Sequence, residues 1–179
     1  MSATKWNNDL NAGQDWMATL NILIADATAN RNITGCTLAS QIRRHWKSVS
    51  SKTTLGIMIL DATTGSIRLM LTAAQTTLLK SGKYVYDIEM TNPHTLSVKE
   101  ATGTFITDEV ITGATSGATG VVIAHSPATQ ITYTVTTGTF SGTEIINGTT
   151  HNAKLVSNDG QPIERVIEGV LTIRPEVTA

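Results

Sequence analysis

Residues 15–24, DWMATLNILI, alternate strictly between an apolar and a mixed face. The apolar positions are Trp16, Ala18, Leu20, Ile22 and Ile24. Side chains that repeat with a period of two line one face of a β-strand. The stretch therefore predicts a strand with one strongly buried side.

The same alternation recurs further along the chain. It is found in residues 36–43, 55–59, 67–71, 84–91 and 163–173. Residues 73–80, AAQTTLLK, precede Ser81-Gly82 and predict one helical turn, and Asp159-Gly160 is a hairpin-type turn signal. Several short strands at roughly ten-residue spacing predict an all-β, antiparallel sandwich.

Composition and charge exclude several classes of partner. The 179 residues suffice for one domain, or for one domain and a smaller second one, while charged residues make up only 15%. A net charge of −1 gives no general attraction to nucleic acid or to an acidic membrane. No signal-like start or long apolar run occurs, so we expect no membrane insertion and no export. Cys36, the single cysteine, is expected to be a small buried hydrophobe.

A long segment separates the strand at 84–91 from the one at 163–173. Within it, residues 103–122 (GTFITDEVITGATSGATGVV) align without a gap to residues 138–157 (GTFSGTEIINGTTHNAKLVS), an offset of 35 residues. The positions that match in the first copy are Gly103, Thr104, Phe105, Glu109, Ile111, Gly113, Thr115 and Ala118. The segment therefore has structure of its own and is not a long loop.

Each copy of this repeat is expected to form a strand, a tight turn and a second strand. Phe105 and Phe140 face inward, and residues 131–135 add a connecting strand. Two copies can cover each other's apolar faces, whereas one isolated hairpin is marginal in water. We therefore expect an inserted β-domain at residues 93–158 within a host domain made of residues 1–92 and 159–179.

The host sequence resembles a family of virion proteins. Short motifs occur in the family's order at residues 33–35, 41–43, 65–71, 75–76, 82–87, 159–160 and 169–178. This order is similar to that of the immunoglobulin-like structural proteins of tailed bacteriophages, a group related to the N-terminal domain of upper baseplate proteins. The resemblance covers about 110 residues and implies an immunoglobulin-like sandwich with other virion proteins as partners.

The repeat has a separate resemblance, to Gly-Thr-Phe and Thr-Ser-Gly-Ala-Thr units of virion proteins from marine and cyanobacterial phages. Two departures stand out: the second copy has His151 to Lys154 in place of Ser-Gly-Ala-Thr, and the chain ends on Ala179 where the host family usually has arginine. Together the two resemblances imply a protein of the virion, assembled in the host cytoplasm, that forms a homo-oligomer in a symmetric ring.

Residues that could support catalysis are few. Asp87, Glu89, Glu164 and Glu168 could form a carboxylate cluster, although a solvated face balanced by Lys83 and Arg165 explains them better. The histidines are His45, His94, His125 and His151, and they lack metal-ligand spacing. No P-loop, nucleophile elbow or dinucleotide motif occurs. We expect no enzyme activity, no cofactor and no metal.

Two groups of residues are candidates for contacts. The first, a possible subunit contact, consists of Trp6, Trp16, Arg43, Arg44 and Trp46. The basic cluster at residues 43–47 could also touch nucleic acid or lie exposed at a strand end, and the two N-terminal tryptophans could instead cap the sandwich. The second group, His125 and Tyr133, could contact a host glycan.

The leading functional hypothesis is a non-enzymatic virion structural protein. It would join or decorate the tail, baseplate or neck and present the inserted domain outward. A capsid decoration protein is an alternative on the same resemblance. A carbohydrate-binding or host-adhesion module, using His125 and Tyr133, is an alternative from another class. A cell-wall hydrolase is the third, and the lack of an acid–base pair argues against it.

Overall fold

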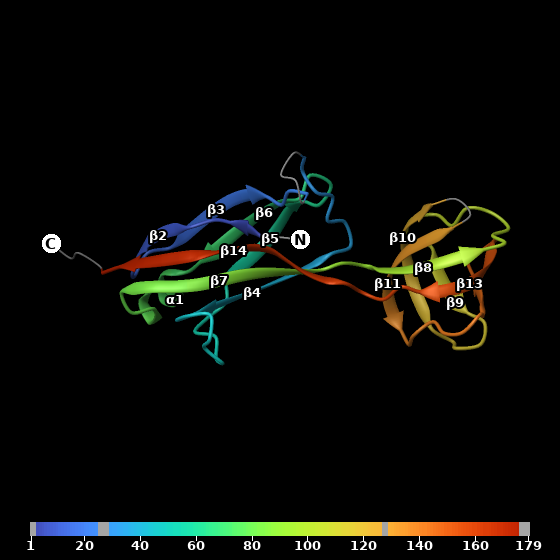
Figure 1. Ribbon diagram of the computed structural model, residues 1–179. Helices are drawn as coiled ribbons and strands as arrows, with labels where there is room; N and C mark the ends of the chain where they lie inside the picture. Colours follow the sequence, from blue (N-terminus) through green and yellow to red (C-terminus); the bar gives the residue numbers. More distant parts are fainter. Residues whose placement is uncertain (1–2, 25–28, 127–128, 176–179) are drawn as a thin grey trace. The chain divides into compact units, whose positions relative to one another are not determined.

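The computed structural model describes residues 3–24, 29–126 and 129–175 of an all-β protein (Figure 1). The chain divides into two compact units, Met1–Met90 with Ile163–Ala179, and Thr91–Pro162. The expected boundaries lay at 92/93 and 158/159. The end of the last family motif, at residues 176–178, and the expected difference at Ala179 lie outside the described residues.

The first unit contains two sheets. The larger has five strands: β1 (Thr4–Lys5), β2 (Asn8–Asn11), β14 (Ile163–Arg174), β7 (Gly82–Thr91) and β4 (Thr37–Arg43). The smaller has three, in the order β3 (Trp16–Asn21), β6 (Ser66–Leu71) and β5 (Gly56–Asp61). In the larger sheet the order is β1-β14-β7-β4, and β2 pairs with β14 beyond β1.

Alternate residues of both sheets form one hydrophobic core. It includes Ile42, Leu69, Leu71, Tyr86, Ile88, Ile167 and Leu171, each at most 3% exposed. Burying one such side chain stabilises a fold by about 1.5–3 kcal/mol, so the period-two pattern is what fixes each strand's orientation. Cys36, expected in the core, lies half-buried against it.

A short helix, α1 (Ala73–Leu78), joins β6 to β7, where the sequence predicts a helical turn. Its first turn has a capping box: the Gln75 N–H donates to Thr72 Oγ1 (3.2 Å) and the Thr72 N–H donates to Gln75 Oε1 (2.9 Å). The N–H of Ala73 donates to Asp15 Oδ1 at 2.6 Å. No helix in the described part of the chain is long and apolar enough to cross a membrane.

The first two strands do not appear in the sequence pattern, because residues 4–11 are mostly polar and their two apolar residues, Trp6 and Leu10, do not make an alternating run. Both strands run parallel to β14, and the ladder is interrupted between them. At the interruption the side chain of Asn7 replaces a backbone group: its Oδ1 accepts the N–H of Val170 at 2.9 Å. The carbonyl oxygen of Trp6 occupies the space that a Cβ at position 169 would need, so this position requires glycine.

The strand expected at residues 15–24 is shorter in the structure. It ends at Asn21, and an isolated bridge follows between Leu23 and Asn30. Ile22, although outside the strand, is 2% exposed and belongs to the core. Ile24, expected on the same buried face, is 38% exposed, so the buried side of this segment ends at Ile22.

The second unit is a closed six-stranded barrel, in the order β10-β11-β8-β13-β12-β9. Its strands are β8 (His94–Lys99), β9 (Val110–Gly113), β10 (Thr119–Ser126), β11 (Gln130–Thr137), β12 (Ile145–Asn147) and β13 (Asn152–Asn158). The interior includes Leu96, Phe105, Ile111, Val122, Ile131, Tyr133, Phe140, Ile146 and Leu155, none more than 2% exposed. Closure leaves the barrel without a free sheet edge.

The β9–β10 and β12–β13 hairpins of the barrel have turns of different length. Ile111 pairs with Gly120 in the β9–β10 hairpin, and Ile146 pairs with Ala153 in the β12–β13 hairpin. The spacings are 120 − 111 = 9 and 153 − 146 = 7, so the second turn is two residues shorter. After the turns the gapless sequence alignment, which places Ala118 opposite Ala153, no longer follows the strand pairing.

The chain enters and leaves the barrel unit at one place. The backbone N–H and the Nδ2 of Asn92 both donate to the carbonyl oxygen of Pro162, each at 3.0 Å. The strands that precede and follow the unit, β7 and β14, are neighbours in the five-stranded sheet. The barrel is therefore a single insertion between two adjacent strands.

Candidate functional site

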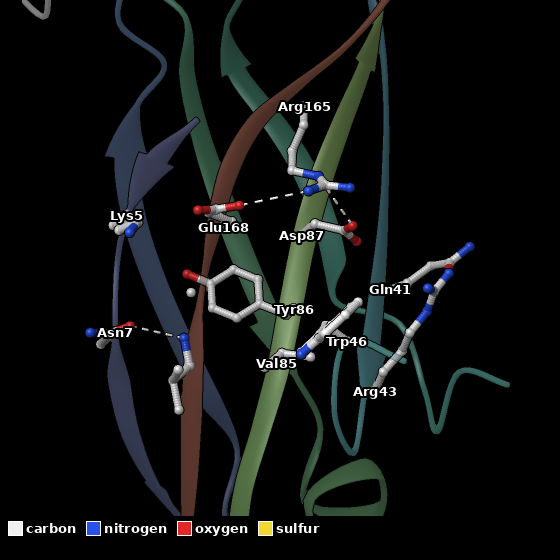
Figure 2. A pocket seen from close by; sticks show the side chains of 12 residues that line it. Lys5, Asn7, Gln41, Arg43, Trp46, Val85, Tyr86, Asp87, Arg165 and Glu168 are labelled. Carbon is white, nitrogen blue, oxygen red and sulfur yellow. Dashed lines mark hydrogen bonds and ion pairs between the residues drawn. The ribbon is translucent and has the colours of Figure 1, made fainter. Parts of the chain in front are cut away.

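The outer face of the five-stranded sheet contains a groove of about 480 Å³ (Figure 2). Its lining combines apolar, basic, acidic and amide side chains. The lining residues come from β1, β4, β7 and β14, from the link between β1 and β2, and from the segment after β4. We treat this groove as the candidate functional site of the first unit.

Trp46 forms the aromatic wall of the groove. It lies on the segment that follows β4 and is 75% exposed, the most exposed of the three tryptophans. The ammonium nitrogen of Lys47 lies 4.9 Å from the centroid of its ring. An exposed ring of this size beside polar groups is a common feature of binding surfaces.

Arg43, the last residue of β4, contributes a guanidinium group to the groove. Its Nη2 donates to Oε1 of Gln41, which also lines the groove. The Nε of Arg43 is buried and has no acceptor among the described residues. A buried donor without a partner costs free energy, roughly 1–3 kcal/mol.

Arg165 links two carboxylates at the other side of the groove. Its Nε lies 3.4 Å from Asp87 Oδ2, and its Nη1 lies 3.7 Å from Glu168 Oε2. The Arg165 side chain is 52% exposed, and exposed pairs of this kind contribute little to stability. Asp87 and Glu168 therefore keep oxygen atoms that can accept further hydrogen bonds.

The other two candidate carboxylates do not join this pair. Glu164 makes a two-pronged contact with Arg31, with both N–O distances at 2.9 Å. Glu89 lies exposed on β7. The four carboxylates that the sequence places on neighbouring strands thus serve two separate ion pairs and an exposed position.

Tyr86 lies at the base of the groove with its hydroxyl turned away to the N-terminal strand. The hydroxyl donates to the carbonyl oxygen of Trp6 at 2.6 Å. Burial raises the pKa of Tyr86 well above its ordinary value. Its phenol therefore stays protonated and acts as a structural donor, while the half-buried Val85 and Val170 give the groove apolar surface.

The five expected subunit-contact residues lie in three different places. Arg43 and Trp46 line the groove, whereas Arg44 lies 4.8 Å above the ring of Tyr84. Trp6 and Trp16 pack on each other, with ring centroids 5.9 Å apart, and both lie half-buried against the core. The two N-terminal tryptophans therefore contribute to the sandwich itself.

Of the two expected glycan contacts, Tyr133 belongs to the interior of the barrel and His125 is half-buried. Tyr133 is 0% exposed and packs against Phe140, with centroids 5.2 Å apart. The Nδ1 of His125 accepts the N–H of Phe105 at 3.1 Å, and burial lowers the pKa of His125. Tyr133 thus has no exposed surface for a sugar.

Sequence reasoning missed two buried carboxylates in the barrel, Glu109 (8% exposed) and Glu144 (6%). Burial alone would raise the pKa of each, but several N–H and hydroxyl donors together hold both below the ordinary value. The repeat gave a signal, since it matches the two acids across 35 residues. They are ionised groups that order the turns around them.

Each carboxylate reaches from its own half of the barrel to the turn of the other half. Glu144 accepts the N–H groups of Thr115 (3.1 Å) and Ser116 (2.9 Å), and also that of Ser141 (2.8 Å) in its own half. Glu109 accepts the N–H of Thr149 and, in its own half, that of Ile106. Charged acceptors make such bonds strong, so the contacts tie the halves together.

The repeated glycines follow from these contacts. A Cβ at Gly113 would collide with the Glu144 carboxylate, and a Cβ at Gly148 would collide with the Glu109 carboxylate and the ring of Phe105. The carboxylate of one half can approach the turn of the other only where the chain has no side chain. The Glu and Gly positions of the repeat thus form one structural device.

Within the described residues, no group of three or more histidine, cysteine, aspartate or glutamate side chains is placed to hold a metal ion. A comparison of the chain with protein-family models gave no match, and no curated protein matched it.

Proposed function

We propose that this chain is a non-enzymatic structural protein of a tailed-phage virion, which joins or decorates the tail, baseplate or neck and displays the barrel. The observation that carries the proposal is the insertion of a complete barrel between β7 and β14, two adjacent strands of the sheet. Such a modular arrangement suits a protein that acts by contacts. The two sequence resemblances point to the virion.

An immunoglobulin-like topology for the host unit is part of this proposal. The order β3-β6-β5 corresponds to strands B-E-D, and β14-β7-β4 corresponds to G-F-C, with β1 and β2 as a divided first strand. Tyr84, near the start of β7, donates its hydroxyl to the carbonyl of Lys80 at 2.9 Å, as the tyrosine corner of this fold does. With one cysteine, the chain lacks the inter-sheet disulfide of antibody domains.

We propose further that the barrel is a duplicated unit. The pairing of Val122 with Tyr133 corresponds to that of Leu155 with Val98, and the ladder is irregular immediately after Val122 and Leu155. Glu109 and Glu144 also correspond, because each accepts a hydrogen bond from the turn of the other half. These agreements support the repeat although the two turns differ in length.

The test is to look for the chain in purified particles of the phage that encodes it. Mass spectrometry should find it as a stoichiometric component, and a cryo-EM map should show both units. A map with density on the tail, baseplate or neck supports the proposal, and density on the capsid surface supports the decoration alternative. Particles that lack the chain would overturn both.

A carbohydrate-binding role is the second candidate, and one observation favours it. The groove brings an exposed tryptophan, a guanidinium group and two carboxylates together on the sheet. Its position differs from the one that the sequence suggests, because Tyr133 is buried.

A further inference from the structure

We infer that the groove on the five-stranded sheet binds an acidic saccharide, a sugar that carries a carboxylate. The carboxylate would bind at Arg43, the sugar ring would lie against Trp46, and its hydroxyl groups would donate to Asp87 and Glu168. This inference concerns the first unit and does not depend on where the protein functions.

The carboxylate position follows from the guanidinium group of Arg43, which lines the groove. Its Nη2 donates to Gln41 and its Nε is buried, so a ligand would reach the terminal nitrogens. A carboxylate is the acceptor that fits a guanidinium group best. Lys5 lines the groove from β1, at the opposite edge of the sheet from Arg43, and adds a second positive charge there (Figure 2).

The aromatic wall selects a ligand with a flat apolar face. Trp46 is 75% exposed, and Lys47 lies close to its ring on the same segment. The C–H groups on one side of a pyranose ring make such a face, while its edge carries hydroxyl groups. Val85 and Val170 extend the apolar surface next to this wall.

Asp87 and Glu168, the two carboxylates of the groove, favour a saccharide over a polyanion as the ligand. Asp87 and Glu168 lie in the same groove as Arg43, so they would repel the successive phosphates of a nucleic acid. Held by Arg165 at 3.4 and 3.7 Å, the two carboxylates can still accept hydrogen bonds from hydroxyl groups. A ligand with one negative charge and several hydroxyls satisfies both ends of the groove.

An acidic peptide fits less well. The groove lies on the face of the sheet, and β14 and β7 each have neighbours on both sides. A peptide that crossed this face could not add a strand, so its backbone groups would lack the partners that sheet edges supply. The volume of about 480 Å³ lies within the roughly 300–1,000 Å³ of small-ligand sites.

The test is calorimetric titration of the full chain with galacturonate and with sialyllactose, two saccharides of different shape that each carry one carboxylate. At least one should bind, and its methyl ester, which lacks the charge, should bind about tenfold more weakly. Trp46→Ala and Arg43→Gln should each weaken binding by about tenfold or more. Lys80→Gln, which removes an exposed charge outside the groove, is the matched control and should bind as the wild type does.

Circular dichroism of the Trp46→Ala and Arg43→Gln variants checks that they remain folded. The inference is overturned if neither acid saccharide binds at millimolar concentration, if the ester binds equally well, or if both groove variants bind like the wild type. Binding of a glutamate-rich peptide or of a single-stranded oligonucleotide in place of the saccharides would also overturn it. Detection of the chain in particles is a separate measurement, so the proposed function can fail or hold independently.

Discussion

The two halves of the barrel are residues 94–126 and 130–158. In each half a buried carboxylate of the other half holds a turn, but the two turns differ in length. In the first half the longer turn is held by Glu144, which accepts two backbone N–H groups and the Ser116 hydroxyl from it. In the second half the shorter turn is held by Glu109 through the N–H of Thr149. The comparison shows that both halves share the buried carboxylate and its bonds to backbone N–H groups, whereas the length of the turn differs.

A second difference lies beside the two phenylalanines. His125 accepts the N–H of Phe105 at 3.1 Å, while Asn158 donates its Nδ2 to the carbonyl oxygen of Phe140 at 3.2 Å. The two halves thus bond to the phenylalanine backbone with opposite polarity at this position. The first half has an imidazole there and the second half an amide, and of the two only the imidazole titrates.

The largest expected effect on stability comes from removing the buried carboxylates, and it should be larger for Glu144 than for Glu109. Glu144→Ala leaves more donors without an acceptor than Glu109→Ala does, so we expect losses in free energy of unfolding of about 3 and about 2 kcal/mol. Hydrogen–deuterium exchange of peptides from residues 94–158 measures the loss in the barrel. Glu89→Ala, at an exposed position, is the control and should change little.

All three tryptophans, Trp6, Trp16 and Trp46, lie in the first unit, so their fluorescence reports on the sandwich during the same experiment. We expect the fluorescence transition to stay in place in both glutamate variants. An equal loss in free energy of unfolding for the two variants, or no loss, would contradict the roles given to Glu109 and Glu144 in holding the turns.

The next effect comes from the glycines. Gly148→Ala should destabilise the barrel by about 2 kcal/mol, and Gly113→Ala by about 1 kcal/mol. At Gly148 the new methyl group meets the ring of Phe105 as well as a carboxylate, whereas at Gly113 it meets two flexible side chains. Thermal unfolding followed by exchange or NMR would rank them. Gly56→Ala, where a Cβ meets only ordinary contacts, should be tolerated.

Acid should affect the barrel through both glutamates. Their pKa values in the folded protein lie below the ordinary 4.5, so the stabilisation is present above that pH and is lost as the pH falls through the folded values. Glu144→Gln should flatten this loss below pH 4.5. A barrel whose stability in that range is the same with and without Glu144→Gln would show that the carboxylate carries no such linkage.

The smallest effect concerns His125. Burial lowers its pKa below 6.5, with a weaker opposing effect from Glu109, so unfolding takes up a proton once the pH drops below 6.5. Stability should decrease from pH 6.5 toward the folded pKa, by less than about 1.4 kcal/mol for each pH unit. His125→Asn copies the second half and should remove this slope, which denaturant titrations at several pH values would measure.

The sequence pattern predicted what depends on alternation. The strand around Trp16, the strand of Tyr84 and Tyr86, and the all-β class all follow from period-two burial. β1 and β2 could not be predicted, because their polar residues are held by backbone pairing to β14. Their existence depends on a partner far away in the sequence.

The candidate site was predictable only in part. Arg43 and Trp46 lie close together in the sequence and form a visible basic and aromatic cluster. Asp87, Arg165 and Lys5 join them only through the order of the strands, which residue patterns do not encode. Glu109 and Glu144 were visible as matched acids, but that each binds the opposite turn requires the closed barrel.

The pairing of the N-terminal strands has a consequence for biosynthesis. β1 and β2 pair with β14 alone, and the bond from Val170 to Asn7 joins residues 163 positions apart. These segments leave the ribosome before their partner, which is made after the whole barrel. Long-range pairing of this kind slows folding and leaves segments unprotected in the meantime. Residues 4–11 are mostly polar, with Trp6 and Leu10 as the exceptions, and this composition limits aggregation while translation continues.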